Sequence, residues 1–449
     1  MKGIPDKIIS RAEVLKHNTI DDCWLIIRNQ VYDLTRFIRS HPGGSNILMT
    51  RAGEDASSYF TAKHGNNASI IRQLERMKIG VLPQHEQVPE EAFEEAFFSE
   101  LVDRSYKEKL YTVQKTKSNH FFLIRTVNII LFFSLSLLAL YGSIPYWTAL
   151  LLVILQAVIS TSLFGLLAHE ATHRNYPGNP VGRTILSAFW PVFWPFISEY
   201  GLRYEHNSHH IKIGDPEYDY EVAAFASFIR YSGHVTPNFL HKHQHKLAKY
   251  IYPFYANIIT TIGGIRSSFW TRHNRRVAFT HNASLLMTTL YFIVLPAIIH
   301  PGNVWWYIVL YLVYQCTLFY GIYVGSAINH FVPPVIQPIP TEFSNKFGYY
   351  VCHNTTNFCT TNKFWNWFTG GFNIQVEHHL IPFIPVENLQ KMIPIVKELC
   401  KKYNYPYQHY NSFRELWNEH YDYLQTMSVA SINSDIQKEK SNKNNYHAR

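Results

Sequence analysis

The class of fold is decided by residues 121–170, FFLIRTVNIILFFSLSLLALYGSIPYWTALLLVILQAVISTSLFGLLAHE. The stretch contains two apolar runs of about 20 residues, and each is long enough to cross a bilayer as a helix. The turn between them, YGSIPYW at 141–147, contains no Lys or Arg. We therefore predict a membrane hairpin whose second helix ends close to His169.

A second pair of apolar segments follows at 279–300 and 304–328, joined by the short turn IHPGN. This turn also lacks Lys and Arg, whereas the basic stretch TRHNRR lies at 271–276, before the pair. Positive residues collect on the cytosolic side of a membrane protein. The pattern predicts an all-α membrane domain over 119–425 with four transmembrane helices in two hairpins. The longer segments between the spans would form a histidine-rich cap in the cytosol.

Composition agrees with a membrane protein that has large water-facing parts, since 47% of residues are hydrophobic and 16% are charged. The formal charge of +9 comes from scattered residues, several of which flank the apolar runs. We predict contact with a lipid bilayer and no binding of nucleic acid. The five cysteines contain no CxxC spacing, which argues against a disulfide scaffold or a zinc–thiolate site.

The polar ends of the chain divide into three predicted units. Residues 1–85 read as a small soluble α+β domain, in which CWLIIRNQVYDLT predicts two short strands around a turn at 28–30. Residues 86–118 carry helical periodicity and predict a linker helix. Residues 426–449 form a polar C-terminal tail. No apolar signal segment opens the chain, so we expect the N-terminus in the cytosol.

Histidines recur in three clusters on the predicted cytosolic side. HEATH supplies two, HNSHH supplies three and QVEHH supplies two behind a glutamine, while SAINH adds one at the end of the last span. The candidate ligands are His169, His173, His206, His209, His210, His330, His378 and His379, with Gln375 in the third cluster. Neutral imidazole is a common metal ligand, and helical spacings of three and four place two rings on one face.

A single HxxxH is weak evidence, because histidines also lie at membrane–water interfaces without binding metal. Three clusters and His330 at one predicted depth favour a metal centre. A zinc site needs only about four ligands, so eight imidazoles indicate two ions, and iron suits such ligands.

The order HxxxH, HxxHH and QxxHH on this span pattern resembles the membrane fatty acid desaturases. The glutamine that opens the third cluster, behind a domain similar to cytochrome b5, resembles the front-end desaturases. The resemblance covers the chain from about residue 8 to about residue 420. It implies a di-iron centre, O₂ as co-substrate, and insertion of a cis double bond between an existing one and the carboxyl end of an acyl chain.

Three alternatives stay open at this point. A sphingoid long-chain base desaturase shares the cytochrome b5 domain and the glutamine. A fatty acid hydroxylase also carries a fused cytochrome b5 domain but differs in histidine spacing. A non-catalytic electron carrier is the third alternative, although the intact histidine set argues against it.

Two positions raise separate questions. Gln375 replaces a histidine, and it would bind iron weakly, hydrogen-bond a metal-bound water or shape the acyl site, unless it lies on a helix surface without a role. Glu170 stands where the family usually has Asp. We expect its carboxylate to support a ligand histidine from the outer shell.

The electron supply is indicated near the N-terminus. HPGG at 41–44 and a later histidine in YFTAKHG are similar to the haem site of cytochrome b5. The resemblance implies one haem b with His41 and His64 as axial ligands, and Gly43 and Gly44 would let the backbone turn beside it. Bis-histidine ligation leaves no open position for oxygen, so this haem would carry electrons.

The same resemblance implies the surroundings of the enzyme. NADH-cytochrome b5 reductase would supply the electrons, and the substrate would be a fatty acyl-CoA or an acyl phospholipid. The expected location is the endoplasmic reticulum membrane, with several spans and with both termini in the cytosol.

Overall fold

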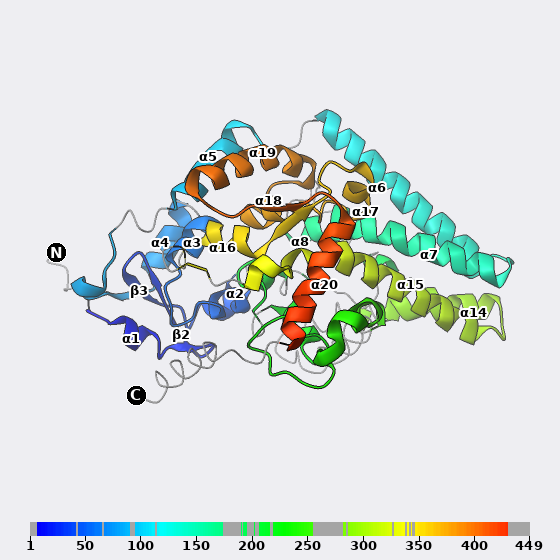
Figure 1. Ribbon diagram of the computed structural model, residues 1–449, viewed down its shortest axis with the longest axis horizontal. Coiled ribbons are helices and arrows are strands. Elements are labelled where there is room, and N and C mark those ends of the chain that lie inside the picture. Colours follow the sequence, from blue (N-terminus) through cyan, green and yellow to red (C-terminus); the bar gives the residue numbers. More distant parts are fainter. Residues whose placement is uncertain are drawn as a thin grey trace.

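The computed structural model describes most of the chain (Figure 1). The described residues are 7–41, 44–64, 67–89, 95–112, 115–173, 190, 192–194, 202, 206–215, 219–254, 282–283, 286–325, 327–336, 339–340, 343 and 346–429.

The N-terminal part contains a four-stranded antiparallel sheet in the order β1-β2-β3-β4, surrounded by short helices. Its elements are α1 (Arg11–Val14), β1 (Asn18–Thr19), β2 (Asp22–Ile27), β3 (Gln30–Asp33), η1 (Ile38–Ser40), α2 (Ser45–Met49), α3 (Ser57–His64), α4 (Ala68–Glu75), β4 (Lys78–Val81) and η2 (Gln84–Glu86). The sheet and helices form the α+β domain that the sequence predicts.

The tight turn between β2 and β3 confirms the predicted hairpin. Ile27 pairs with Gln30, and the two residues between them, Arg28 and Asn29, have φ angles of 51° and 62°. Two consecutive positive φ angles characterise a type I′ turn, whose twist matches that of paired strands.

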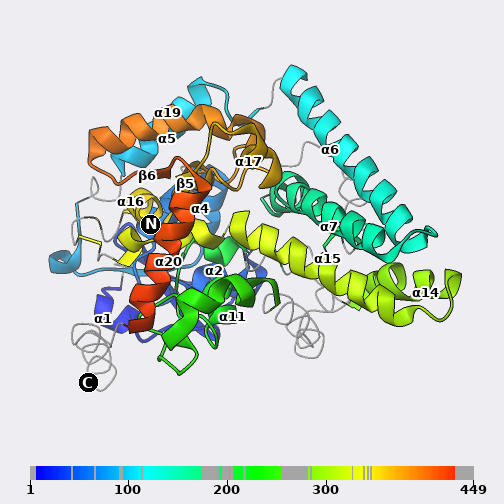
Figure 2. The same ribbon diagram turned by 45° about the vertical axis from the view of Figure 1, so that its right-hand side comes forward.

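Three helices are long and apolar enough to cross a membrane: Asn119–Tyr141, Tyr146–Thr172 and Val304–His330. They are built from α6 (Lys115–Ser136) with η4 (Leu137–Tyr141), α7 (Tyr146–Leu163) with the turns that follow it, and α15 (Val304–Gly325) with η8 (Ala327–His330). Figure 2 shows α6, α7 and α15 extending to the same side of the molecule. The first predicted hairpin is therefore present.

The predicted third span, 279–300, is described only in part. An apolar helix covers Leu286–Ile299, including η7 (Leu290–Val294) and α14 (Leu295–Ile299). A helix of this length measures about 21 Å, which is shorter than the roughly 30 Å hydrocarbon core. Residues 279–281, 284 and 285 lie outside the described part of the chain, so the described residues contain candidates for three of the four predicted spans.

The remaining elements gather at the end of the spans that carries His169 (Figure 1). They are α5 (Ala96–Lys107), α11 (Tyr220–Phe225), η6 (His241–His243), η9 (Pro333–Ile336), α16 (Phe347–Asn354), β5 (Thr356–Phe358), α17 (Lys363–Phe368), α18 (Gln375–Leu380), α19 (Val386–Tyr403), β6 (Gln408–Tyr410) and α20 (Phe413–Val429). Phe97, Phe98 and Leu101 of α5 are buried against α19 and its neighbours. Phe93 lies outside the described residues.

Two contacts hold α18 and its flanks against the spans. Gly165 packs so closely on Gly370 that a Cβ at Gly165 would lie 2.7 Å from the Gly370 Cα. Arg125 of α6 forms a buried ion pair with Glu387 of α19, with 3.0 Å between Nη1 and Oε1. Breaking such a buried pair by removing one partner costs about 3–5 kcal/mol. The segment that carries the third histidine cluster is therefore fixed from both sides.

Candidate metal centre and haem site

The first two histidines come from the end of α7. The π-helical turn η5 (Phe164–His169) continues α7, and α8 (Glu170–Thr172) leads on to His173. Both imidazoles are buried, and their ring centroids lie 4.9 Å apart. Single π-helical turns within α-helices frequently mark functional sites. The helix presents both rings to one side, as the spacing predicts.

The other six histidines come from three segments far apart in the sequence. His206, His209 and His210 lie on the helical turn at 206–209 and directly after it. His378 and His379 belong to α18, and His330 ends η8. Five of these six are almost fully buried, and His206 is half-buried.

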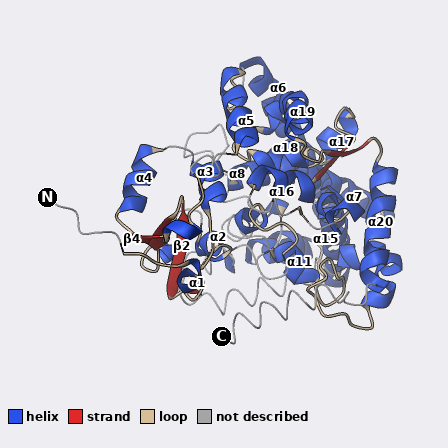
Figure 3. Ribbon diagram, turned by 60° about the vertical axis from the view of Figure 1, so that its left-hand side comes forward, coloured by secondary structure: helices blue, strands red, loops and turns tan. Residues whose placement is uncertain are grey.

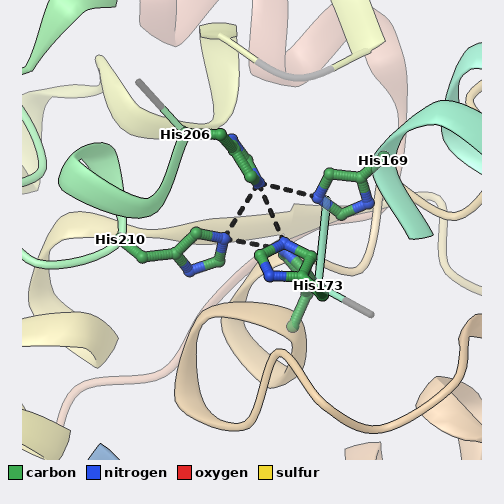
Figure 4. Close-up of side chains that lie close together, drawn as sticks. His169, His173, His206 and His210 are labelled. Carbon is green, nitrogen blue, oxygen red and sulfur yellow. Dashed lines mark hydrogen bonds between the residues drawn. The ribbon is translucent and has the colours of Figure 1, made fainter. Parts of the chain in front are cut away.

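The eight predicted ligands sort into two groups, in each of which the possible ligand atoms lie within 4.8 Å of one another. The five-histidine group contains His169, His173, His206, His210 and His378, and the three-histidine group contains His209, His330 and His379. Figure 4 shows four members of the first group with their rings directed at one another. Each neighbouring pair, His209–His210 and His378–His379, is divided between the two groups.

The five-histidine group fits a metal ion. His206 Nε2 lies 2.9 Å from Nε2 of His169, 3.1 Å from that of His173 and 3.0 Å from that of His210. An imidazole nitrogen carries one proton or one lone pair, so hydrogen bonding cannot satisfy three such contacts at one atom. A cation among these atoms would use the lone pairs, and nitrogens bound to one ion at about 2.1 Å lie roughly 3 Å apart.

The three-histidine group is supported from outside. His209 Nε2 lies 3.3 Å from His330 Nε2. The other ring nitrogens face outward: His209 Nδ1 donates to Asp219 Oδ2 at 2.9 Å, and His330 Nδ1 donates to the Asn354 carbonyl at 3.0 Å. Such bonds fix the tautomer that leaves Nε2 free to bind a metal.

Burial also keeps the imidazoles neutral. It lowers the pKa of His206, His210, His378 and His379 well below the ordinary value, and the neighbouring rings lower each pKa further. The neutral form is the one that binds a metal ion.

The predicted axial pair lies in the N-terminal domain. The ring centroids of His41 and His64 are 6.4 Å apart, and His41 Nδ1 donates to the Gly44 carbonyl at 3.1 Å. Two imidazoles bound on opposite sides of one metal ion would have centroids roughly 6 Å apart. Gly44 has a φ of +97°, which favours glycine, and Gly43 lies outside the described residues.

A cavity of about 400 Å³ surrounds this pair, and its walls fit a haem. Apolar side chains such as Leu25, Phe37 and Leu74 line one part of it. The opposite part reaches the desaturase-like half of the chain, where Thr172, His173, Asn207 and His210 line the same cavity. Figure 3 shows α3 at the edge of the N-terminal domain that faces α8 and α16. The haem pair and the five-histidine group thus border a single cavity.

Comparison with known proteins agrees with this arrangement. Residues 144–411 match the model of the fatty acid desaturase family, and residues 10–83 match that of the cytochrome b5-like haem/steroid binding domain. The chain belongs to the fatty acid desaturase family. The match makes it an oxidoreductase, and haem, iron and O₂ are the cofactors and co-substrate that its two domains imply.

Three curated relatives extend over almost the whole desaturase. Acyl-lipid (8-3)-desaturase B of Dictyostelium discoideum is 28% identical, with 94% of each chain covered. Delta(5) fatty acid desaturase A of the same organism is 25% identical, with 95% of each covered. Acyl-lipid (9-3)-desaturase of Borago officinalis is 25% identical over 91% of this chain and 90% of its own. These names favour fatty acid desaturation over the three alternatives considered above.

Gln375 is buried in this desaturase. It is 2% exposed, and its Oε1 has no hydrogen-bond partner among the described residues. Because α18 begins at Gln375, its side chain lies on the helical face of His378 and His379, three and four residues later. A buried acceptor without a partner costs free energy unless a ligand or water satisfies it. A surface position is thereby excluded.

Glu170 does not make the contact that we expect from the sequence. Its Oε2 accepts a hydrogen bond from the Val386 backbone N–H at 3.4 Å, and no hydrogen bond in the described residues joins it to a histidine. The carboxylate that hydrogen-bonds to one of the predicted ligands, His209, is Asp219, which sequence reasoning missed. The sequence offers little to identify Asp219 beyond an acidic residue that follows Gly214 closely. In the structure, the Gly214 N–H donates to Asp219 Oδ2 at 2.8 Å.

Proposed function

We propose that this desaturase uses O₂ to insert a cis double bond between an existing double bond and the carboxyl end of a fatty acyl chain. The observation that supports this most directly is the single cavity bordered by the haem pair and by the five-histidine group. That arrangement suits an enzyme whose electron supply and reaction centre belong to one chain.

The proposed ligands follow the geometry. His41 and His64 would bind one haem b, and each histidine group would bind one iron ion, giving two. Bound iron supplies the activation of O₂ and the removal of hydrogen from the acyl chain. The protein keeps the imidazoles neutral, fixes His209 and His330 through Asp219 and the Asn354 carbonyl, and excludes water by burying the site.

The electron donor, the substrate, the membrane and the domain bounds are proposed on the basis of the same function. The electrons would come from NADH-cytochrome b5 reductase, and the substrate would be an acyl phospholipid or an acyl-CoA in the endoplasmic reticulum membrane. Four spans would keep both termini and the histidine-rich cap in the cytosol. The units would be residues 1–85 for haem, 86–118 as linker, 119–425 for desaturation and 426–449 as tail.

Feeding experiments test the reaction. The chain is expressed in a host without polyunsaturated fatty acids, candidate acids are fed, and product double bonds are located by mass spectrometry. Carbon 5 is the first position to examine, because Delta(5) stands in the name of one relative. A His378→Ala variant expressed to the same level should give no product. New double bonds only in sphingoid bases would contradict the proposal.

A second experiment tests the haem ligands. The purified full chain should show a low-spin bis-imidazole spectrum, and His64→Ala should abolish it while leaving the non-haem iron content unchanged. A full haem spectrum in that variant would refute the assignment of His64.

Topology is tested with glycosylation acceptors inserted at 142–146, at 300–303 and within 203–270. Modification is expected at the first two sites only. Glycosylation within 203–270 would separate the second histidine cluster from the haem domain and would overturn the proposed orientation.

A further inference from the structure

One helix of the cap packs on its neighbours through only one of its faces. η6 (His241–His243) continues as a helix over 244–254, and we refer to the two together as the 241–254 helix. Its buried residues recur at helical spacing: His241, Gln244, Ala248 and Tyr252. Gln244 Nε2 donates to the Leu424 carbonyl of α20 at 2.9 Å. The opposite face of the helix is directed away from the cap.

This outer face combines large apolar side chains with lysines. Tyr250 and Phe254 are 60% and 61% exposed, and Phe239, in the turn before the helix, is 82% exposed. Three exposed lysines follow one another at spacings of four and three residues: Lys242, Lys246 and Lys249. No ion pair among the described residues involves these lysines, and the sequence from 231 to 281 contains no Asp or Glu. Exposed aromatic residues beside lysines are typical of helices that lie on a bilayer surface.

A contact with a span gives the depth of the 241–254 helix. The ring of Tyr252 stacks on that of Tyr323 in α15, with a centroid distance of 3.6 Å. Tyr323 lies 19 residues after Val304, the first residue of the span, or about 29 Å along the helix axis. This length matches the roughly 30 Å hydrocarbon core, so Tyr323 lies near the level at which hydrocarbon meets the headgroups. The 241–254 helix therefore lies at headgroup depth beside a span.

We infer that the 241–254 helix binds anionic phospholipids of the leaflet beside the cap. Tyr250 and Phe254 enter the zone between headgroups and acyl chains, where aromatic rings are enriched in membrane proteins. The lysines extend along this zone and place their ammonium groups at lipid phosphates and carboxylates. Apolar contact is the same for every phospholipid, so the preference for anionic lipid comes from the lysines. The inference does not depend on the reaction that the histidine groups carry out.

The test measures the lipid selectivity of the purified full-length protein in phosphatidylcholine vesicles. Trace spin-labelled phosphatidylserine or phosphatidylcholine is added, and electron paramagnetic resonance gives the fraction of each label that the protein immobilises. A lysine near a lipid surface favours anionic lipid about fivefold, and lipid around the rest of the spans dilutes this effect. At low salt we therefore expect the unsubstituted protein to favour phosphatidylserine about threefold. High salt should remove most of this preference.

The variants separate the lysines from other sources of charge. Replacing Lys242, Lys246 and Lys249 together by Gln should lower the preference to about 1.5-fold or less, and replacing all three by Arg should retain it. Lys246→Gln alone should give a smaller loss in the same direction.

The matched control removes three exposed charges from the haem domain, at the end of the molecule opposite α14 (Figure 1): Lys16→Gln, Arg72→Gln and Arg76→Gln together. This control should keep the full preference for phosphatidylserine. Unchanged selectivity in the triple lysine-to-glutamine variant, or an equal loss in the control, would overturn the inference.

Two further measurements distinguish other occupants of this face. Inorganic phosphate added at constant ionic strength should leave the selectivity unchanged, whereas displacement of the lipid would show a site for free phosphate. Tyr250→Gln with Phe254→Gln should leave the mass of the protein in detergent, measured by light scattering, unchanged. A fall in that mass would show that a second copy of the chain covers the face, and either result would overturn the assignment to lipid.

Discussion

The two histidine groups differ in how they are built. In the five-histidine group, one atom, His206 Nε2, lies within 3.1 Å of three other ring nitrogens. The three-histidine group has fewer imidazoles, but two of them are oriented by hydrogen bonds that they donate to the Asp219 carboxylate and to the Asn354 carbonyl. The first group is defined by close contacts among the imidazoles themselves. The second group is oriented by hydrogen bonds to residues outside it.

The two groups would therefore differ in how many coordination positions they leave open on a bound ion. Five imidazoles can nearly fill the coordination of an ion, whereas three leave positions open, as in catalytic metal sites. A buried Gln375 with an unpartnered oxygen lies on the helix that serves both groups. We therefore expect iron binding in the three-histidine group to depend on the hydrogen bond to Asp219. Iron binding in the five-histidine group should depend on His206.

The largest effect is expected at that central ligand. His206→Ala removes the nitrogen that three other imidazoles approach, so activity should fall by more than about 1000-fold. Non-haem iron, measured as total iron minus haem, should drop from about two to about one per protein, because the three-histidine group retains its own ligands. Iron analysis beside product yield measures both. His243→Ala, at an exposed histidine, is the matched control. Two non-haem irons in His206→Ala would show that the groups are not separate sites.

Gln375→Ala should reduce product yield by about 100-fold while iron content falls only modestly, because a weak ligand or outer-shell group acts on turnover more than on affinity. Gln375→His restores the HxxHH pattern of the second cluster and should retain full iron, yet turn over poorly. Iron per protein and product yield are compared for both variants. Unchanged activity in Gln375→Ala would remove this residue from the chemistry.

Residue spacing singled out the eight histidines that the structure brings together in two groups. Adjacent residues of a helix point about 100° apart, so neighbours such as His209 and His210 reach different sides. The haem pair was equally visible, because HPGG and a following histidine lie within one small domain. The first prediction rests on local geometry, and the second on the resemblance of the two motifs to cytochrome b5.

Tertiary contacts were not readable in the same way. Asp219 accepts hydrogen bonds from both His209 and the Gly214 N–H, and nothing in the spacing identifies it. The support expected from Glu170 was wrong because its carboxylate instead meets the N-terminus of α19. The close contact between Gly165 and Gly370 joins segments 205 residues apart, which no local pattern encodes.

The outer shell of the three-histidine group is tested by Asp219→Asn. An amide in place of the carboxylate no longer stabilises the His209 tautomer that donates from Nδ1, so activity should fall about tenfold or more. Iron should be lost from this group at a lower chelator concentration than from the five-histidine group. Asp215→Asn removes a carboxylate that pairs with Lys212 at 3.7 Å and serves as control. Equal loss of both irons would contradict separate support of the groups.

The smallest effect on function is expected from a change at Gly165, in the π-helical turn that leads to His169. A Cβ at Gly165 would lie 2.4 Å from the Thr369 carbonyl oxygen, closer than real contacts allow, so the π-helical turn before His169 or the segment at 369–370 must move. Such overpacking costs about 1–3 kcal/mol. Gly165→Ala should therefore lower the temperature at which the purified protein loses its monodisperse peak.

Gly325→Ala provides the matched control for this last prediction. Gly325 faces the same Thr369, but its Cβ would meet the nearest atom at an ordinary 3.5 Å. It lies at the end of α15, where alanine is the better helix former, so its stability should stay the same or rise slightly. Because η5 carries His169, Gly165→Ala should also weaken iron binding in the five-histidine group and leave the three-histidine group unaffected. Equal behaviour of the two alanine variants would show that the close glycine contact does not position His169.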